Sequence, residues 1–159
     1  MSHSRLSRRD LLLSGATLAG LAAVPALAAS EAVPVHVRKD PDCSCCTAWI
    51  DILQADGFDV TVEMVPPAEL AAFKASRGIP AAMVSCHTAE AGGYLIEGHV
   101  PMADLRRLLA EKPDALGLSV PGMPWGSPGM GPEAEREAYD VHLIARDGST
   151  TVFTSYPAA

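Results

Sequence analysis

Asp42-Cys43-Ser44-Cys45-Cys46-Thr47 is the stretch around which the rest of this chain is organised. It places three of the chain's four cysteines within four positions. Cys43 and Cys46 form a C-x-x-C pair, and a thiol–disulfide enzyme needs no third sulfur. Thiolates select soft metals such as Cu(I), zinc or iron–sulfur clusters. We interpret the stretch as a metal-binding segment, with a structural disulfide or small buried cysteines as the alternatives.

The flanking residues place these cysteines on a turn between a strand and a helix. Val35-His36-Val37 alternates as a strand does, and Lys39-Asp40-Pro41-Asp42 has the composition of a turn. Apolar residues then recur with helical spacing at Cys46, Trp49, Ile50 and Leu53. The sulfurs therefore lie at a helix N-terminus, where the partial positive charge stabilises thiolate. Because Cys46 begins the apolar stripe, we expect it to be the most buried of the three.

The first 29 residues have the features of an export signal rather than of a folded domain. Three arginines precede an apolar segment, residues 11–24, that is too short to span a membrane. Ala26-Leu27-Ala28 fits a cleavage site, and Ser7-Arg8-Arg9-Asp10-Leu11-Leu12 resembles a twin-arginine signal. An ordinary secretory leader and an uncleaved anchor are the alternatives. We expect export to the periplasm, an oxidising compartment, with cleavage near Ala28.

The mature chain is acidic. Cleavage of the leader removes three of the 12 basic residues and one of the 19 acidic residues. The mature chain then has 9 basic and 18 acidic residues, a net charge of −9. Such a chain lacks the basic cluster that nucleic acids and anionic membranes require. We therefore expect neither nucleic acid nor membrane as a partner after cleavage, and we expect a monomer.

The order of elements after the cysteines predicts an α/β fold. The patterns indicate strands at 59–65, 82–87 and 94–97, the last two antiparallel, and helices at 67–77 and 102–111. Strand–helix–strand–helix–strand–strand–helix, with C-x-x-C at the first strand–helix turn, is the thioredoxin order. In that fold a cis proline precedes the third strand, so we expect a cis Ile79–Pro80 bond. The predicted domain covers residues 30–112, with flanking helices around a central sheet.

A C-terminal extension, residues 113–159, follows this domain. Residues 113–132 contain five prolines and five glycines, which exclude a helix or a central strand over 120–130. A disordered linker is one reading, but a linker has little use for Trp125 and two methionines. We expect an Ω-like loop laid over the site. Asp147-Gly148 then indicates a β-hairpin formed by 139–145 and 150–155.

Further residues with soft or nitrogen donors are candidates for the same site. Cys86 and His87 end the predicted third strand, and His99 follows the fourth. Met123 and Met130 lie in the Pro/Gly-rich loop, where a thioether binds Cu(I) or fills a gap. A buried strand cysteine, hydrogen-bonded histidines and a helix cap are the structural alternatives. His36 and His142 lie in strand patterns, and we assign them no role at the site.

Four of these motifs, in this order, resemble the CopG-type copper-resistance family. They are 39–49 with its C-x-C-C, Ser85-Cys86-His87-Thr88, 93–101, and the loop 117–130. The resemblance spans the mature chain and implies an exported, thioredoxin-like protein of copper handling whose C-terminal extension helps to bind the metal. It implies copper ions on Cys43, Cys45, Cys46, Cys86, His87, Met123 and Met130, and we add His99 as a further candidate ligand because of its place after the fourth strand. It also implies copper efflux or delivery proteins of the periplasm as partners.

Three functions are compatible with these motifs. The first is an exported copper-binding protein of copper resistance that interconverts Cu(I) and Cu(II), which would make it a copper oxidoreductase. The second is a thiol–disulfide oxidoreductase in which Cys43 attacks and Cys46 resolves, and it leaves Cys45 and the loop methionines without a role. The third is a zinc or iron–sulfur site formed by the four cysteines.

Overall fold

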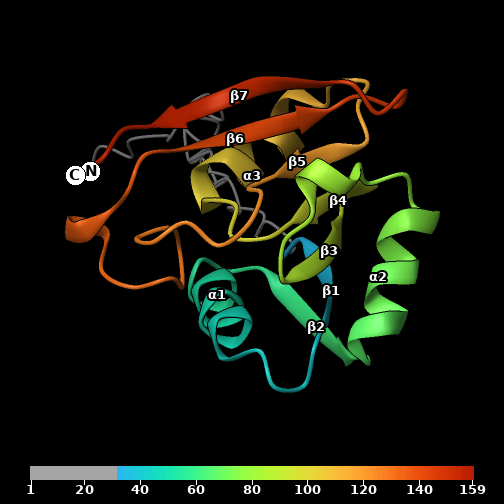
Figure 1. Cartoon of the computed structure of the whole chain (residues 1–159), viewed down its shortest axis with the longest axis horizontal. Coiled ribbons are helices and arrows are strands. Elements are labelled where there is room, and N and C mark those ends of the chain that lie inside the picture. Colours follow the sequence, from blue (N-terminus) through green and yellow to red (C-terminus); the bar gives the residue numbers. More distant parts are fainter. Residues whose placement is uncertain (1–31) are drawn as a thin grey trace, which may run out of the picture. The chain divides into compact units, whose positions relative to one another are not determined.

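A computed structural model describes residues 32–159 as one sheet of seven strands with helices on both faces (Figure 1). The predicted leader lies outside the described residues. The helices and strands, in chain order, are β1 (Pro34–Lys39), α1 (Ser44–Ala55), β2 (Asp59–Met64), α2 (Pro67–Ser76), a 3₁₀ turn (Ala81–Met83), β3 (His87–Ala91), β4 (Tyr94–Glu97), α3 (Met102–Glu111), β5 (Gly117–Ser119), a 3₁₀ turn (Glu133–Glu135), β6 (Tyr139–Ile144) and β7 (Thr150–Tyr156).

The strand order is β2-β1-β3-β4-β5-β6-β7. β1 runs parallel to β2 and antiparallel to β3, and β3 runs antiparallel to β4. This arrangement confirms the predicted fold class, an α/β thioredoxin-like sheet with flanking helices. It also brings the C-terminal end of β1, where the cysteine turn begins, beside the N-terminal end of β3.

The two faces of the sheet are covered by different helices, and strand alternation decides which side chains each helix meets. α1 and α3 pack on one face against a core that includes Val37, Ala89 and Ile96 (Figure 1). Residues one position along these strands point to the other face, which α2 covers. Glu97 is one of them, and it meets Lys74 of α2.

The C-terminal extension continues the sheet instead of forming a separate layer. β5 joins β4 in parallel, and the predicted hairpin, β6 and β7, adds two antiparallel strands beyond it. Asp147 supports the hairpin turn by accepting a hydrogen bond from Ser149 N at 2.9 Å. The hairpin and the loop extension are therefore confirmed, and the three-residue strand β5 was not predicted.

Two predictions around Pro80 are wrong. The Ile79–Pro80 bond is trans, as all peptide bonds in the described part of the chain are. The chain after Pro80 forms a 3₁₀ turn closed by a Met83 N to Pro80 O bond of 2.8 Å, so no strand starts there. The third strand begins only at His87, because the side chains of Lys74 and Glu97 take both backbone polar groups of Ser85, which forms only an isolated bridge with Gly122.

Candidate metal centre

The cysteine turn is built as its residue types require. Asp40 accepts a hydrogen bond from Asp42 N through its carboxylate at 2.9 Å and from Cys43 N through its carbonyl at 3.2 Å, which closes the turn after β1. Cys43 is the N-cap of α1, and its sulfur accepts the Cys46 amide at 3.4 Å. The three cysteines thus occupy the cap and first turn of a helix, as predicted.

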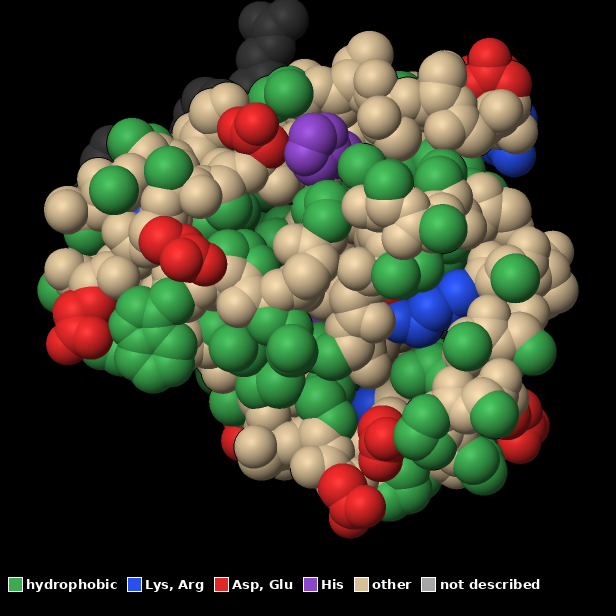
Figure 2. Space-filling model, viewed as in Figure 1, with side chains coloured by type: hydrophobic (Ala, Val, Ile, Leu, Met, Phe, Trp, Pro, Cys, Tyr) green, Lys and Arg blue, Asp and Glu red, His purple; other side chains and the backbone are tan. Residues whose placement is uncertain are grey.

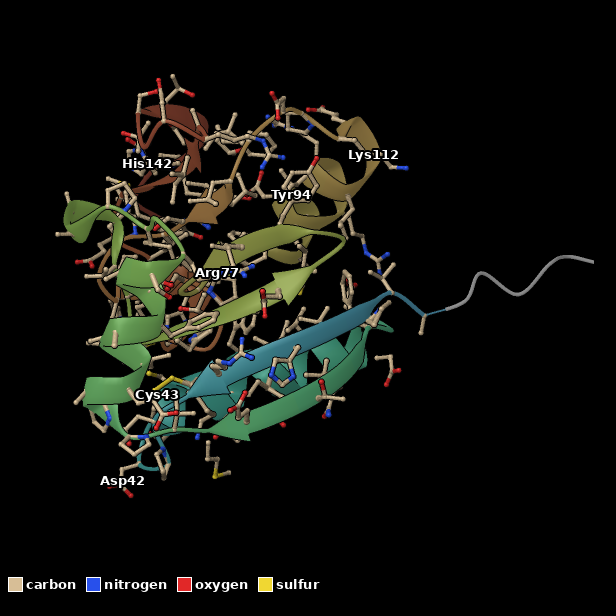
Figure 3. The ribbon with its side chains drawn as sticks, turned by 90° about the vertical axis from the view of Figure 1, so that its right-hand side faces the viewer. Asp42, Cys43, Arg77, Tyr94, Lys112 and His142 are labelled. Carbon is tan, nitrogen blue, oxygen red and sulfur yellow. A yellow bond between two sulfur atoms is a disulfide. The ribbon has the colours of Figure 1, made fainter. Side chains whose placement is uncertain are left out.

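The three sulfurs of the turn are not equivalent. Cys43 and Cys46 form a disulfide, whereas Cys45 is a free thiol with its sulfur 3.5 Å from that of Cys43. Cys46 is completely buried and the other two are half-buried, which confirms the expected order of burial. Figure 3 shows the yellow disulfide by the Cys43 label, beside the lower end of α2 in that view. This state is the oxidised form of the site, in which only Cys45 of the turn offers a thiol.

Cys86 joins the turn from the start of β3. The sulfurs of all four cysteines lie within 4.8 Å of one another. Burial raises the pKa of the Cys86 thiol to about 12, and the neighbouring Cys45 adds to the shift. A thiol with so high a pKa stays protonated in the absence of a cation, and a bound soft metal supplies the charge that favours its thiolate.

Two histidines extend the cluster inward from Cys86. His99 Nε2 lies 3.1 Å and His87 Nδ1 lies 3.3 Å from the Cys86 sulfur. His99 Nδ1 lies 2.8 Å from Pro128 O. Because a carbonyl oxygen only accepts, that nitrogen carries the proton and Nε2 presents its lone pair to the cluster. In proteins that bind metals, the far nitrogen of a histidine ligand is often fixed by a backbone carbonyl in the same way.

His87 is the more deeply buried of the two. Burial and the neighbouring His99 hold its pKa well below the usual value, and burial also lowers the pKa of His99. Both rings are therefore neutral at physiological pH and able to bind a cation. His87 Nε2 is a buried side-chain nitrogen without a hydrogen-bond partner among the described residues. His87 also contacts the ring of Trp49, 4.5 Å between centroids, which fixes it from the α1 side.

The Pro/Gly-rich loop covers the cluster as a fixed segment. Gly129 lies so close to α1 that a Cβ there would be 2.8 Å from Trp49 N and 3.1 Å from Cys45 O. Gly122 pairs with Ser85, next to Cys86. The backbone carbonyl of Pro128 fixes His99. The expected loop over the site is therefore present.

The two loop methionines follow these contact points. Met123 comes after Gly122 and is 55 % exposed, and Met130 comes after Gly129 and is half-buried. Their backbone is thus adjacent to the cluster from two sides. Coordination by their thioethers remains a prediction, as does metal coordination by the cysteines and histidines. His36 bonds Thr61 and Glu63 on β2, and Figure 3 shows His142 far from Cys43, so both lie apart from the site as expected.

A cavity of about 760 Å³ opens beside the sulfurs. Apolar residues of α2 and of the segment 79–84 line it, together with Lys74, Asp40, Asp42, Cys43 and Cys86. Val84, Met123 and Trp125 are among the exposed large hydrophobic side chains. Figure 2 shows groups of hydrophobic side chains on the face in view, with Lys or Arg atoms exposed among them.

Two residues at the site were missed by sequence reasoning. Lys74 and Glu97 form an ion pair, with 2.5 Å between Nζ and Oε1, and both bond the backbone of Ser85, the residue before Cys86. One signal was available, because Lys74 lies four residues after Leu70 on the inward stripe of its helix. A lysine there is either a long side chain reaching solvent or a buried charge with a partner. The sequence does not distinguish the two.

Comparisons with solved structures show what this arrangement is similar to. A structure described as "Copper resistance protein copG- Form 2" is 43 % identical, with a TM-score of 0.74, and the match covers 80 % of this chain and 100 % of that one. "Copper resistance protein copG- Form 1" is 41 % identical with the same coverage and a TM-score of 0.75. Residues 83–130 match a family described as "Protein of unknown function, DUF411". No curated protein matches the chain.

Proposed function

Because the chain belongs to the family of the copper resistance protein CopG, we propose that it binds copper in copper resistance. One observation carries this proposal. Four cysteine sulfurs from two distant segments lie within 4.8 Å of one another, and Cys86 also belongs to a second group with His87 and His99. Sulfur and imidazole donors suit copper, and hard cations prefer oxygen. The unpartnered His87 Nε2 adds a further donor to this set.

Two donor groups that share Cys86 suit more than one copper ion. A thiolate can bridge two copper ions, so the cysteine group and the Cys86–His87–His99 group together fit a small cluster. In the oxidised form only two thiols, Cys45 and Cys86, are free. Reduction of the Cys43–Cys46 disulfide supplies two more thiolates, so copper capacity rises on reduction. Met123 and Met130 are the proposed loop ligands above the cluster.

We further propose that the Cys43–Cys46 pair interconverts the two oxidation states of copper. Two Cu(II) ions each take one electron from the thiolates of Cys43 and Cys46, and the two sulfurs join as the disulfide. The products are two Cu(I) ions, which Cys45, Cys86 and the histidines then hold. The balance is two electrons, and no further reductant is needed for one turnover. An exported chain in the periplasm, cleaved near Ala28, is the proposed setting, with copper efflux or delivery proteins as partners.

The helices of the described residues also bear on whether the chain could span a membrane. None of the helices in residues 32–159 is long and apolar enough to cross a bilayer. The segment 11–24 lies outside those residues, and its role as part of an export signal remains a prediction.

Metal analysis of protein reduced and loaded without oxygen tests copper binding. We expect retention of more than one Cu(I) per chain after removal of free metal. Cys43→Ser and Cys86→Ser should each lower the copper retained, whereas His36→Ala, a matched change away from the sulfurs, should not. Protein that retains no copper, or cysteine variants that retain as much as the wild type, would overturn the proposal.

A second function is favoured by the disulfide alone, namely thiol–disulfide exchange by Cys43 and Cys46. The half-buried Cys43 is then the sulfur that a partner's thiolate attacks, and the fully buried Cys46 leaves. Insulin reduction separates the two functions. Activity that survives both Cys45→Ser and a copper chelator supports this second function, and activity that is lost with Cys45 does not.

A further inference from the structure

The ion pair between Lys74 and Glu97 binds the chain at the residue before Cys86. Lys74 Nζ donates to Ser85 O at 2.6 Å, and Ser85 N donates to Glu97 Oε1 at 2.6 Å. The two charged groups are 2.5 Å apart, and their side chains are 6 % and 0 % exposed. Both backbone polar groups of Ser85 are therefore held by side chains from α2 and β4.

The same carboxylate also holds the chain after Cys86. Thr88 Oγ1 donates to the second oxygen of Glu97 at 2.5 Å. Gly98, the residue after Glu97, donates its amide to His87 O at 3.0 Å. Cys86 and His87 thus lie between two fixed points, and both points depend on Glu97 and its neighbour. A Cβ at Gly98 would lie 2.5 Å from the Cβ of Ser85, so the close approach requires glycine.

A buried ion pair is a poor way to gain stability. The desolvation of two charges costs several kcal/mol, and apolar residues of similar volume are often as stabilising. The partners of its hydrogen bonds explain the pair better, because they are Ser85 and Thr88, on either side of Cys86 and His87. We propose that Lys74 and Glu97 are positioning residues that hold Cys86 against Cys45, and so join the cysteine turn to the two histidines. This inference rests on the proposed function only for the identity of the metal, because the positioning of Cys86 follows from the hydrogen bonds themselves.

A purely structural role, in which the pair anchors α2 to the sheet, is the competing explanation. Asp104 provides the matched control, because it is also a buried carboxylate, at 3 % exposure. It accepts hydrogen bonds from Thr154 Oγ1 at 2.5 Å and Tyr156 OH at 2.7 Å, which belong to β7 and not to the site. Asp104→Asn should therefore disturb the fold without disturbing Cys86.

Phenylarsine oxide tests the juxtaposition without copper, because trivalent arsenic bonds two thiols only when they lie close together. With the Cys43–Cys46 disulfide intact, Cys45 and Cys86 are the two free thiols of the full chain. We expect Glu97→Gln and Lys74→Met to weaken arsenical binding about tenfold, the usual loss when a residue behind a metal ligand is changed. Asp104→Asn should bind as the wild type does. Unchanged binding in Glu97→Gln, or an equal loss in Asp104→Asn, overturns the proposal.

Two further measurements serve as controls, one for loss of folding and one for copper binding. If Glu97→Gln does not fold, the double variant Lys74→Met/Glu97→Gln, which leaves no unpaired charge, takes its place and must show the same loss. In reduced protein, Glu97→Gln should weaken Cu(I) binding about tenfold in the wild-type background and have no further effect in a Cys86→Ser background. A wild-type protein that binds the arsenical but no copper refutes the proposed function alone, and the arsenical result still decides the positioning role.

Discussion

Two buried carboxylates, Asp104 in α3 and Glu97 in β4, obtain their hydrogen-bond partners in different ways. Asp104 lies in the first turn of α3, where the helix end favours its charge, and two hydroxyl groups of β7 complete its bonds. Glu97 lies at the end of β4 with a lysine from another helix and two groups that flank Cys86. A carboxylate that serves only the fold needs no counter-charge here. Glu97, which bonds the residue before Cys86, is paired with the charge of Lys74 and so links α2 to the site.

The largest expected effect is on stability at the Lys74–Glu97 pair. Glu97→Gln leaves the lysine charged and buried, so the free energy of unfolding in urea should fall by about 3–5 kcal/mol. Asp104→Asn leaves a neutral group short of one partner and should cost about 1–3 kcal/mol. Lys74→Met/Glu97→Gln should recover most of the loss. Equal losses in the two single variants would remove the distinction between these carboxylates.

The loop contact on α1 should give an intermediate effect. Gly129→Ala and Gly122→Ala both place alanine at a positive φ, 84° and 69° respectively. Each substitution should therefore lower the free energy of unfolding by about 1 kcal/mol for this reason alone. Only the alanine at 129 also meets the backbone of Trp49, whereas nothing lies within 4 Å of a Cβ at 122. Gly129→Ala should therefore lose about 1–3 kcal/mol more in urea unfolding and retain less copper. Two variants that behave alike would show that the loop does not press on α1.

The smallest expected effect is the response of the extension to alkaline pH. Burial raises the pKa of Tyr139 to about 12 from an ordinary value of 10.0, and burial and Asp104 raise the pKa of Tyr156 as well. The fold thus keeps protons that the unfolded chain releases, so their contribution is complete below pH 10 and is lost as pH rises through the folded values. Thermal unfolding between pH 9 and 12 should show this loss, and Tyr139→Phe should reduce it. A loss that is the same in Tyr139→Phe would contradict the assignment.

Elements with a strong local pattern were predictable from the sequence. Helix α3 spans Met102–Glu111 and β4 spans Tyr94–Glu97, both as predicted, because apolar spacing and the residues at their ends agree. The cysteine turn was predictable for the same reason. Its composition fixes a turn, and the apolar stripe from Cys46 fixes the orientation of the helix.

Features set by tertiary contacts were not predictable. The apolar run Ala82-Met83-Val84 resembles a strand, but the backbone of Ser85 bonds Lys74 and Glu97 and the strand starts later. β5 has three residues, too few for a period to be recognised, and it exists because β4 and β6 flank it. The sequence placed Cys86 and His99 near the turn only through the inferred fold. It did not show that Cys86 links the cysteines to the histidines.

X-ray absorption at the copper edge of reduced, anaerobically loaded protein tests the central claim most directly. We predict a first shell dominated by sulfur, with a nitrogen contribution from imidazole, and fewer sulfur neighbours per copper in Cys86→Ser. A first shell of nitrogen and oxygen alone, or a spectrum that Cys86→Ser leaves unchanged, would contradict a copper site formed where the two cysteine segments meet.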